Sequence, residues 1–405
     1  MAKPELSGRE RVLAALAHQE PDRVPWDLCA TGQTGLRIET QDALLRFWEL
    51  DERTEQPLDP LFRIAQPHPA FLERYPPDLV GFRPTLAPLL PEDEEEELEE
   101  RYEWQIEHHL LPPTETQPAR IQETARDGWG VLWERTEGES CFRPAEPPLA
   151  EAESLQEVES FPFPDPSDER QWEPFRPDAE RATILGGWGR GFLETGRLLL
   201  GPRRVFRDWM AQEGFFEALA ERLLESKLRY WETRRQELSA QAEPPTLLVE
   251  TECLDLFEEL PVDLELFRRH VKPFWRRLLE PLKEWFPESK CFLFARSYHF
   301  THVQELIEIG VELLPLVPER IVDETMEFLK REFGGTLTFV GGGDYEPKEF
   351  LRGSQEQAAD QVKRTLDIWA PSGGFLWAPY PVVEPEVPPE NLVAALDTLF
   401  QYGLY

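Results

Sequence analysis

The sequence has little positive charge and little cysteine. Its 405 residues include 43 Lys and Arg against 78 Asp and Glu, which gives a formal net charge of −35 at pH 7. Because affinity for the phosphate backbone comes from clustered Lys and Arg, this balance excludes a general nucleic-acid binder. The four cysteines lie far apart without a CxxC pair, which argues against a disulfide scaffold and a structural zinc module. We therefore expect a reducing compartment.

Long apolar segments are also missing. No apolar run approaches the roughly 18 residues that a membrane span needs, and the N-terminal MAKPELSGRERVLAALAHQ lacks the apolar core of a signal peptide. We expect a soluble, cytoplasmic protein that does not enter a membrane. The chain does have core material, because 40% of its residues are hydrophobic and 11% aromatic, which excludes disorder throughout. Its 39 prolines indicate many stiff loops.

The N-terminal half has an irregular pattern. A first helix is predicted after Ser7, where Ser7 and Glu10 have the spacing of a capping box, and it should end before Pro21. Prolines and acidic residues then dominate. The acidic run 92–100 is interpreted as a solvated loop or helix face rather than a metal site. We expect one domain over residues 1–405, with residues 84–126 as an exposed acidic insertion.

After residue 182, short apolar runs alternate with helical periods. Helices are indicated around Phe215, Leu306, Val362 and Leu392. The predicted strands are 183–186, 246–250, 290–295, 311–316, 336–341 and 374–379. This alternation is typical of βαβ units and a parallel sheet. No glycine-rich nucleotide motif opens a helix, so we predict an α/β fold with a (β/α)8 TIM barrel rather than an open doubly wound sheet.

In such a barrel the residues after each strand form the site, because these loops meet at one mouth. The candidates at these positions are Asp27, Glu250, Glu252, Asp255, Arg296, Tyr298, His299, His302, Asp344, Tyr345 and Tyr380.

Each candidate has a structural alternative. Glu250 and Glu252 share one face of an extended segment and suit acid/base work, although neighbouring carboxylates are common in so acidic a chain. Arg296 follows an apolar strand and is expected either to bind a substrate carboxylate or to pair with an internal Glu. His299 and His302 have metal-ligand spacing, but His302 also fits the first turn of a helix.

Several motifs share one family pattern. They are RERVLAALAHQEPDRVPWDL at 9–28, DGWG at 127–130, PLAEAESLQEVESFPFPDP at 148–166, FRRHVKPFWRRLLEPLK at 267–283, ELIEIGVELL at 305–314, GGTLTFVGGGD at 334–344, PSGGFLWAP at 371–379 and VPPENLVAALDTLFQYG at 387–403. In content and order they resemble the uroporphyrinogen decarboxylase superfamily over nearly the whole chain. The resemblance implies a TIM barrel, often as a homodimer. It also implies one of two activities: cofactor-free decarboxylation of uroporphyrinogen, or zinc-dependent methyl transfer involving corrinoid proteins and a thiol acceptor.

The chain departs from both branches of this family. In place of the decarboxylase motif MRQAGRY it has CATGQTGLR at 29–37, which keeps only Arg37, and its charge of −35 disfavours a substrate with eight carboxylates. The opening resembles the methyltransferase-like branch. However, the expected His-x-Cys-Gly position reads FARS at 294–297, and Tyr380 replaces a late His. The family's paired acidic positions fall near Glu252 and Cys253, so one carboxylate and one potential thiolate remain.

We therefore expect a methyltransferase-like enzyme with an altered site, acting on a small polar or corrinoid-linked substrate. A corrinoid-linked substrate implies a corrinoid protein as partner. No cofactor is secured. Zinc would require Glu252, Cys253 and His299, and a metal-independent site would use Glu252, Arg296, Asp344 and Tyr380 as catalytic residues. The expected substrate-binding residues are Asp27, Arg37, Trp129, Tyr298 and His299.

Two alternatives stay open. One is a decarboxylase or lyase of tetrapyrrole metabolism, which needs several basic residues at the mouth, with Arg296 best placed and Arg37 and Arg190 as further candidates. The other is a catalytically degenerate barrel that binds a corrinoid or a partner protein.

Overall fold

The computed structural model describes most of the chain. The described residues are 6–51, 53–54, 57–85, 106–113, 118–239, 241, 243–257, 260–316, 323–342 and 352–405. The acidic run 92–100 and the candidates Asp344 and Tyr345 lie outside them.

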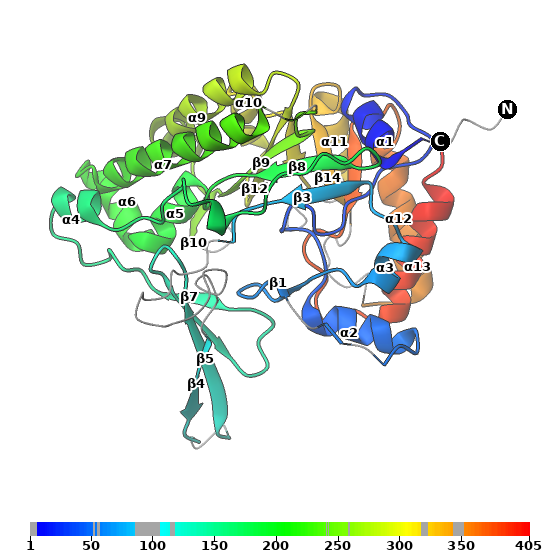
Figure 1. The fold of residues 1–405 in the computed structure, drawn as a ribbon, viewed down its shortest axis with the longest axis horizontal. Helices are drawn as coiled ribbons and strands as arrows, with labels where there is room; N and C mark the ends of the chain where they lie inside the picture. The colour runs from blue at the N-terminus through cyan, green and yellow to red at the C-terminus, as the bar shows by residue number, and fades with distance from the viewer. Residues whose placement is uncertain are drawn as a thin grey trace.

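A curled, parallel, seven-stranded sheet forms the centre of the fold (Figure 1). Its strand order is β15-β14-β13-β12-β9-β8-β3. The strands are β3 (Leu79–Phe82), β8 (Ala182–Gly186), β9 (Leu247–Cys253), β12 (Lys290–Arg296), β13 (Leu313–Pro315), β14 (Thr338–Gly342) and β15 (Phe375–Ala378). All six strands predicted after residue 182 are confirmed, with ends shifted by at most three residues. β3 was not predicted, because its apolar run is short and lies between prolines.

The sheet is a half-barrel and not the closed eight-stranded barrel that the sequence predicted. Residues 24–27 run between the two edge strands without forming a named strand. The Asp27 amide donates to the Trp377 carbonyl of β15 (2.9 Å), and the Asp78 amide, next to β3, donates to the Trp26 carbonyl (3.0 Å). A single parallel bridge joins Trp26 to Trp377. The segment therefore connects the edges through isolated hydrogen bonds.

Strand alternation divides the core into two parts. Side chains on the concave face of the sheet form a small apolar cluster with helix α1 (Gly8–Leu16). It contains Val12, Leu79, Ile184, Leu247, Val249, Phe292, Phe294, Leu313, Val340, Leu376 and Tyr380. The intervening residues, such as Leu248 and Leu293, belong to the larger cluster under the helices. Each strand thus has an inner and an outer face, and successive residues of a strand point to the two faces in turn.

Helices cover the outer face, as Figure 1 shows for α7, α9 and α10 on one part of the sheet and α12 and α13 on another. The other long helices are α2 (Ile38–Phe47), α5 (Phe192–Leu199), α6 (Pro202–Ala211), α7 (Phe215–Leu238), α9 (Lys272–Trp285), α10 (Phe300–Glu308), α11 (Asp323–Phe333), α12 (Gln355–Trp369) and α13 (Pro389–Tyr402). The shorter ones are α3 (Pro69–Arg74), α4 (Leu155–Ser160) and α8 (Leu264–Leu266). The predicted capping box of Ser7 and Glu10 is present at α1. No helix of the described residues is long and apolar enough to cross a membrane.

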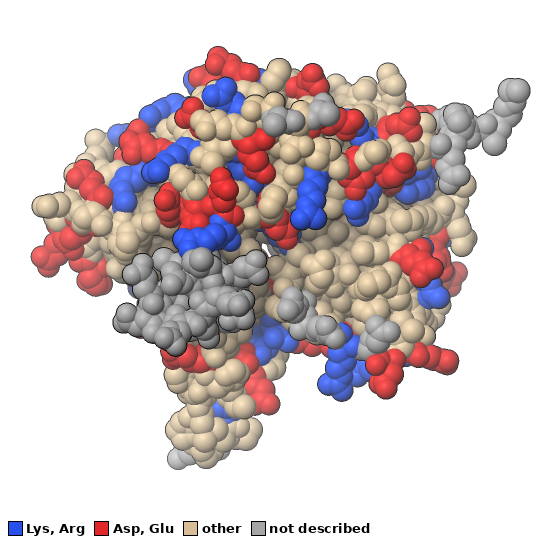
Figure 2. Space-filling view, in the orientation of Figure 1, with Lys and Arg blue, Asp and Glu red and all other residues tan. Residues whose placement is uncertain are grey.

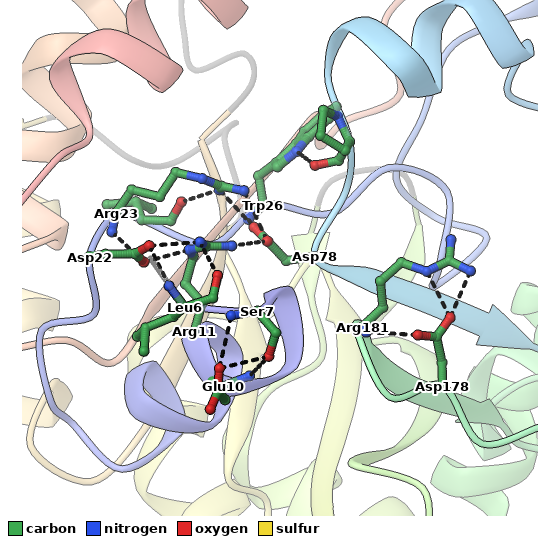
Figure 3. Close-up of polar contacts among 12 residues, drawn as sticks. Leu6, Ser7, Glu10, Arg11, Asp22, Arg23, Trp26, Asp78, Asp178 and Arg181 are labelled. Atoms are coloured by element: carbon green, nitrogen blue, oxygen red, sulfur yellow. Dashed lines mark hydrogen bonds and ion pairs between the residues drawn. The ribbon is translucent and has the colours of Figure 1, made fainter. Parts of the chain in front are cut away.

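A buried ion network fastens α1 to the start of β3 (Figure 3). Asp78 accepts hydrogen bonds from Arg11 Nη1 (2.5 Å), Arg23 Nη1 (2.7 Å) and the Trp26 amide (2.9 Å). Arg11 Nε also donates to Asp22 at 2.7 Å. The charges of the two arginines and the two aspartates cancel. The network therefore fixes residues 22–26 beside β3 without burying a net charge.

An antiparallel arm projects from the half-barrel (Figure 1). It consists of β4 (Ile106–Leu111), β5 (Arg120–Arg126), β6 (Leu132–Thr136) and β7 (Arg143–Glu146) in that order. β4 and β5 belong to the expected insertion 84–126, and β4 is largely exposed. Two further hairpins pair β1 (Pro57–Asp59) with β2 (Ile64–Ala65), and β10 (Asp255–Phe257) with β11 (Leu260–Pro261).

Candidate functional site

A cavity of about 630 Å³ opens at the carboxyl ends of β3, β8 and β9. Its sheet wall consists of Arg83 after β3, Gly186 and Gly187 of β8 and its loop, and Val249 and Thr251 of β9. The opposite wall comes from residues 31–33, residues 57–62 and the base of the arm, including Ile106 and Trp129. Ligand sites of parallel α/β proteins lie at this end of the sheet, and the volume suits a small molecule. The cavity is therefore the candidate active site.

Arg190 is fixed in the loop between β8 and α5, on the cavity wall. Its guanidinium lies 5.2 Å from the centre of the Phe62 ring and 5.1 Å from that of Trp133. Its Nη1 also donates to Glu194 Oε1 at 3.2 Å. Cation–π contacts hold a guanidinium in place while leaving other donors available. Arg190 is thus a pre-positioned cation at the cavity.

Glycines bring this loop close to its neighbours. A Cβ atom on Gly187 would lie 2.3 Å from Glu250 Cδ, and one on Gly189 would lie 2.6 Å from the ring of Trp129. Gly189 also has a positive φ of 68°. Side chains at these positions would push the loop away from β9 and the arm. The glycines of GGWGRG therefore allow the loop to pack closely against β9 and the arm, and this packing positions Arg190.

Arg83 is the second arginine on the cavity wall. Its Nη1 donates to the Cys29 carbonyl at 3.1 Å, and no carboxylate of the described residues forms an ion pair with it. A Cβ on Gly32 would lie 2.6 Å from this nitrogen, so Gly32 makes room for the guanidinium. Arg83 therefore keeps donors for a ligand.

Acidic side chains line the cavity as well, namely Asp59, Asp127 and Glu173. Asp127 organises the DGWG turn, because its carboxylate accepts from the amides of Trp129 and Val131 (both 3.0 Å) and from Trp133 Nε1 (2.9 Å). These hydrogen bonds lower the pKa of Asp127, but burial raises it by more, so the pKa lies above its usual value. A wall with both charge signs favours a polar ligand with more than one kind of group.

Arg296 lies on the inner face at the end of β12 but does not line the cavity. It pairs with Glu194 of α5 at 2.6 Å. Burial alone would raise the pKa of Glu194, but Arg296, Arg190 and Arg197 outweigh it and hold the pKa below its usual value. The carboxylate in turn raises the pKa of Arg296. Of the two interpretations of Arg296, the structure gives the internal ion pair.

Glu252 lies on the outer face of β9, away from the cavity. Its carboxylate accepts from the amides of Glu194 (2.9 Å) and Leu193 (3.2 Å), and from Trp275 Nε1 of α9 (2.9 Å). It therefore caps the N-terminus of α5. Burial raises its pKa to about 7. The acid/base role expected of Glu252 has no geometric support, because no oxygen of this carboxylate is on the cavity wall.

Glu250 shares this outer face, as the sequence indicated. It pairs with Lys227 Nζ at 2.5 Å and accepts from Trp231 Nε1 at 2.7 Å, both on α7. The shared face was predicted correctly, but it faces the helices and not the mouth. Thr251, between the two glutamates, is the residue that reaches the cavity.

The proposed zinc ligands do not come together. His299 caps α10, where its side chain bonds the Thr301 hydroxyl (2.9 Å), and His302 lies in the first turn of that helix, as one alternative expected. Cys253 Sγ contacts Arg197 Nη1 (3.5 Å) and Asp255 (3.4 Å). Within the described ranges, no group of three His, Cys, Asp or Glu could hold a metal ion. Glu252, Cys253 and His299 therefore do not fit zinc.

The remaining candidates divide between cavity and core. Trp129 lines the cavity. Arg37 pairs with Glu384 (2.8 Å) and is buried. The Tyr298 hydroxyl donates to the Pro315 carbonyl (2.7 Å), and Tyr380 packs on Phe294 with ring centres 4.7 Å apart. These three are structural in this conformation.

Asp27 lies near the cavity without lining it. It is 1% exposed, and burial raises its pKa to about 6. Sequence reasoning missed Arg83 and gave Arg190 only a minor place. Arg190 follows a predicted strand and could have been found by the same rule as Arg296, whereas Arg83 follows the unpredicted β3.

No family model and no curated protein matches the sequence. Among solved structures, the chain is similar to an endo-1,4-beta-xylanase from Caldicellulosiruptor owensensis, with 15% identity, 46% of this chain and 69% of that chain covered, and a TM-score of 0.29. It is also similar to the muconate lactonizing enzyme from Pseudomonas putida, with 12% identity, 73% and 77% covered, and a TM-score of 0.20. Scores this low carry no conclusion about function.

Proposed function

We propose that this protein is an enzyme of the uroporphyrinogen decarboxylase superfamily, from its methyltransferase-like branch, that acts on a small polar substrate with an anionic group. The observation that supports the proposal is the cavity at the carboxyl end of the sheet, where Arg83 and Arg190 are held with donors available. The sequence motifs supply the family. The family also implies the finer fold, a (β/α)8 barrel in which residues 24–27, which hydrogen-bond to residues at both edges of the half-barrel, stand in place of the missing strand.

Arg190 and Arg83 bind the anionic group in this scheme, because a guanidinium offers several donors to a carboxylate or phosphate. Trp129 and Phe62 cover the ligand from the arm side and exclude water, and Thr251 supplies a hydroxyl on the sheet side. The family's reaction moves a methyl group between a small molecule and a corrinoid. In this protein the corrinoid would be a substrate, and a partner protein would carry it. Since the described residues do not fit zinc, no step relies on that metal.

The charges in the cavity argue against the decarboxylase alternative. A substrate with eight carboxylates needs many cations, whereas among the described residues two arginines and three acidic residues line this cavity. Arg37 and Arg296, the other basic residues expected to bind it, are occupied by Glu384 and Glu194.

Ligand binding and turnover test the proposal together. We expect at least one compound from a panel of small carboxylates and phosphates to raise the melting temperature of the protein, and Arg190→Gln to weaken its binding by about tenfold or more in calorimetry. Arg235→Gln is the matched control, because Arg235 also lies on a ring, Trp285 at 5.4 Å, but outside the cavity. Arg235→Gln should bind normally.

Turnover is measured with methylcobalamin and a thiol, by the change in corrinoid absorbance, and separately with uroporphyrinogen. Loss of methylcobalamin that depends on Arg190 supports the proposal. Stepwise loss of carboxyl groups from uroporphyrinogen would favour the decarboxylase instead. Binding without either reaction would favour the degenerate barrel.

A further inference from the structure

A buried carboxylate is connected to the cavity by two hydroxyl groups. Thr34 Oγ1 donates to Asp27 Oδ2 at 2.5 Å, and Thr34 Oγ1 lies 3.2 Å from Thr31 Oγ1. Thr34 is fully buried, whereas Thr31 is half-buried and lines the cavity. The three side chains therefore form one hydrogen-bonded row from the interior of the fold to the wall of the candidate site.

We infer that Asp27 exchanges a proton with the cavity through the hydroxyls of Thr34 and Thr31. The inference deepens the proposed function, on which it rests for the use of the cavity, by adding a store for one proton to the same site. Asp27 does not line the cavity, so it acts through Thr31.

The transfer balances at each oxygen. A proton from a donor in the cavity bonds to Thr31 Oγ1 while the Thr31 hydroxyl proton passes to Thr34 Oγ1. The Thr34 hydroxyl proton passes to Asp27 Oδ2, and the carboxylate becomes a neutral acid. Three O–H bonds form, and three bonds to hydrogen break, including the one in the donor. Thr31 Oγ1 also accepts from the Gln33 amide at 3.1 Å, which fixes its orientation.

The surroundings of Asp27 suit this role. The other oxygen, Oδ1, accepts from the Ala30 amide at 3.1 Å, and no cation of the described residues forms an ion pair with the carboxylate. The charged and titratable groups near it are Arg83 and Cys29. Burial raises the pKa of the Cys29 thiol to about 12, and burial raises that of Asp27 to about 6. Of the Asp27 carboxyl and the Cys29 thiol, only the carboxyl thus changes its charge near neutral pH.

Infrared spectroscopy of protein labelled with 13C-aspartate tests the inference without any substrate. We expect a carboxylic-acid band that Asp27→Asn removes and that titrates with a midpoint near pH 6. After a rapid pH jump from a caged proton, Thr31→Val should slow the growth of this band by about tenfold or more, while Thr31→Ser should restore the rate. Thr31→Val keeps the Thr34–Asp27 hydrogen bond, so the equilibrium midpoint should stay in place.

Thr85→Val is the matched control, because Thr85 lines the same cavity but is not part of the row. Its rate should equal that of the wild type. A band that does not titrate between pH 4 and 8 would show that Asp27 stores no proton. Equal rates for Thr31→Val and the wild type would show that the proton takes another route. Either result overturns the inference, whereas failure of the proposed function would appear only in the ligand and turnover assays.

Discussion

Arg296 at the end of β12 and Glu194 at the start of α5 form an ion pair of 2.6 Å. Glu194 has a side-chain exposure of 6%, and Arg190 donates to the same oxygen. The pair therefore joins the cation at the cavity to the inner face of the sheet. Its first consequence concerns stability, because a buried carboxylate depends on its partners.

Arg296→Ala should destabilise the protein by about 3 kcal/mol, the lower end of the range for breaking a buried pair, because Arg190 still pairs with Glu194. Urea unfolding measures the change. Arg331→Ala is the control, since its pair with Glu332 is exposed and should contribute less than about 1 kcal/mol. The folded-state pKa of Glu194 is depressed below 4.5, so the contribution is present above pH 4.5 and is lost as the pH falls through the folded-state value. Equal effects of the two substitutions would contradict this account.

Asp78→Ala should cost about 3 kcal/mol, because it leaves Arg11 Nη1 and the Trp26 amide buried without an acceptor, although Arg11 keeps its pair with Asp22. Asp178→Ala is a suitable comparison, since Asp178 pairs with Arg181 in the same region (Figure 3), but at a side-chain exposure of 21% against 2% for Asp78. Its cost should stay below about 1 kcal/mol. Thermal and urea unfolding of both variants measure the difference. A small effect at Asp78 would mean that α1 is held by apolar packing alone.

The strands are buried on both faces, and this explains which features of the site could be predicted from the sequence and which could not. The apolar runs at 246–250 and 290–295 have the length of strands and lie between helical periods, so their existence was predictable. Both faces of such strands are apolar, so the pattern does not show which face turns inward. Glu250 and Glu252 were therefore placed together correctly but on the wrong side, and Thr251 was overlooked.

The arm and β3 escaped prediction for other reasons. β4 reads IEHHLL and lies at the edge of its sheet, where its side chains are mostly exposed, so no alternation of buried and exposed residues marks it as a strand. β3 has four residues and ends at Phe82, and Arg83 and a proline follow it, so it has too little pattern to be recognised as a strand. Without β3 the rule that selects residues after strands could not reach Arg83.

The arrangement of charges in the structure also limits what the net charge says about the ligand. On the face drawn in Figure 2, basic side chains are interspersed among the acidic ones. Local pairs such as Arg277 with Glu221 (2.6 Å) offset charge over short distances, and screening limits what remains over longer ones. The net charge of −35 is therefore a weaker guide to the ligand than the two arginines of the cavity.

Asp27 should make the stability of the protein depend on pH. Its pKa rises from 3.8 to about 6 on folding, so its neutral form is favoured in the folded state. The resulting contribution is full below pH 3.8, is lost as the pH rises through about 6, and is constant above that. It amounts to about 3 kcal/mol. Asp27→Asn should remove this dependence, since an amide can bond to both Thr34 and the Ala30 amide. Urea unfolding from pH 4 to 8 checks it, and parallel curves for variant and wild type would refute it.

At Gly187, the loop that carries Arg190 has no room for a side chain. A Cβ there would lie 2.3 Å from Glu250, which cannot move aside because Lys227 and Trp231 hold its carboxylate. Gly187→Ala should therefore destabilise the protein by about 1–3 kcal/mol and displace the loop. It should also weaken any ligand that depends on Arg190, as measured by calorimetry. Gly335→Ala is the control, because nothing lies within 4 Å of its Cβ position, and its unfolding free energy should stay within about 0.5 kcal/mol of the wild type. If Gly187→Ala behaves like Gly335→Ala, close packing against β9 does not position Arg190.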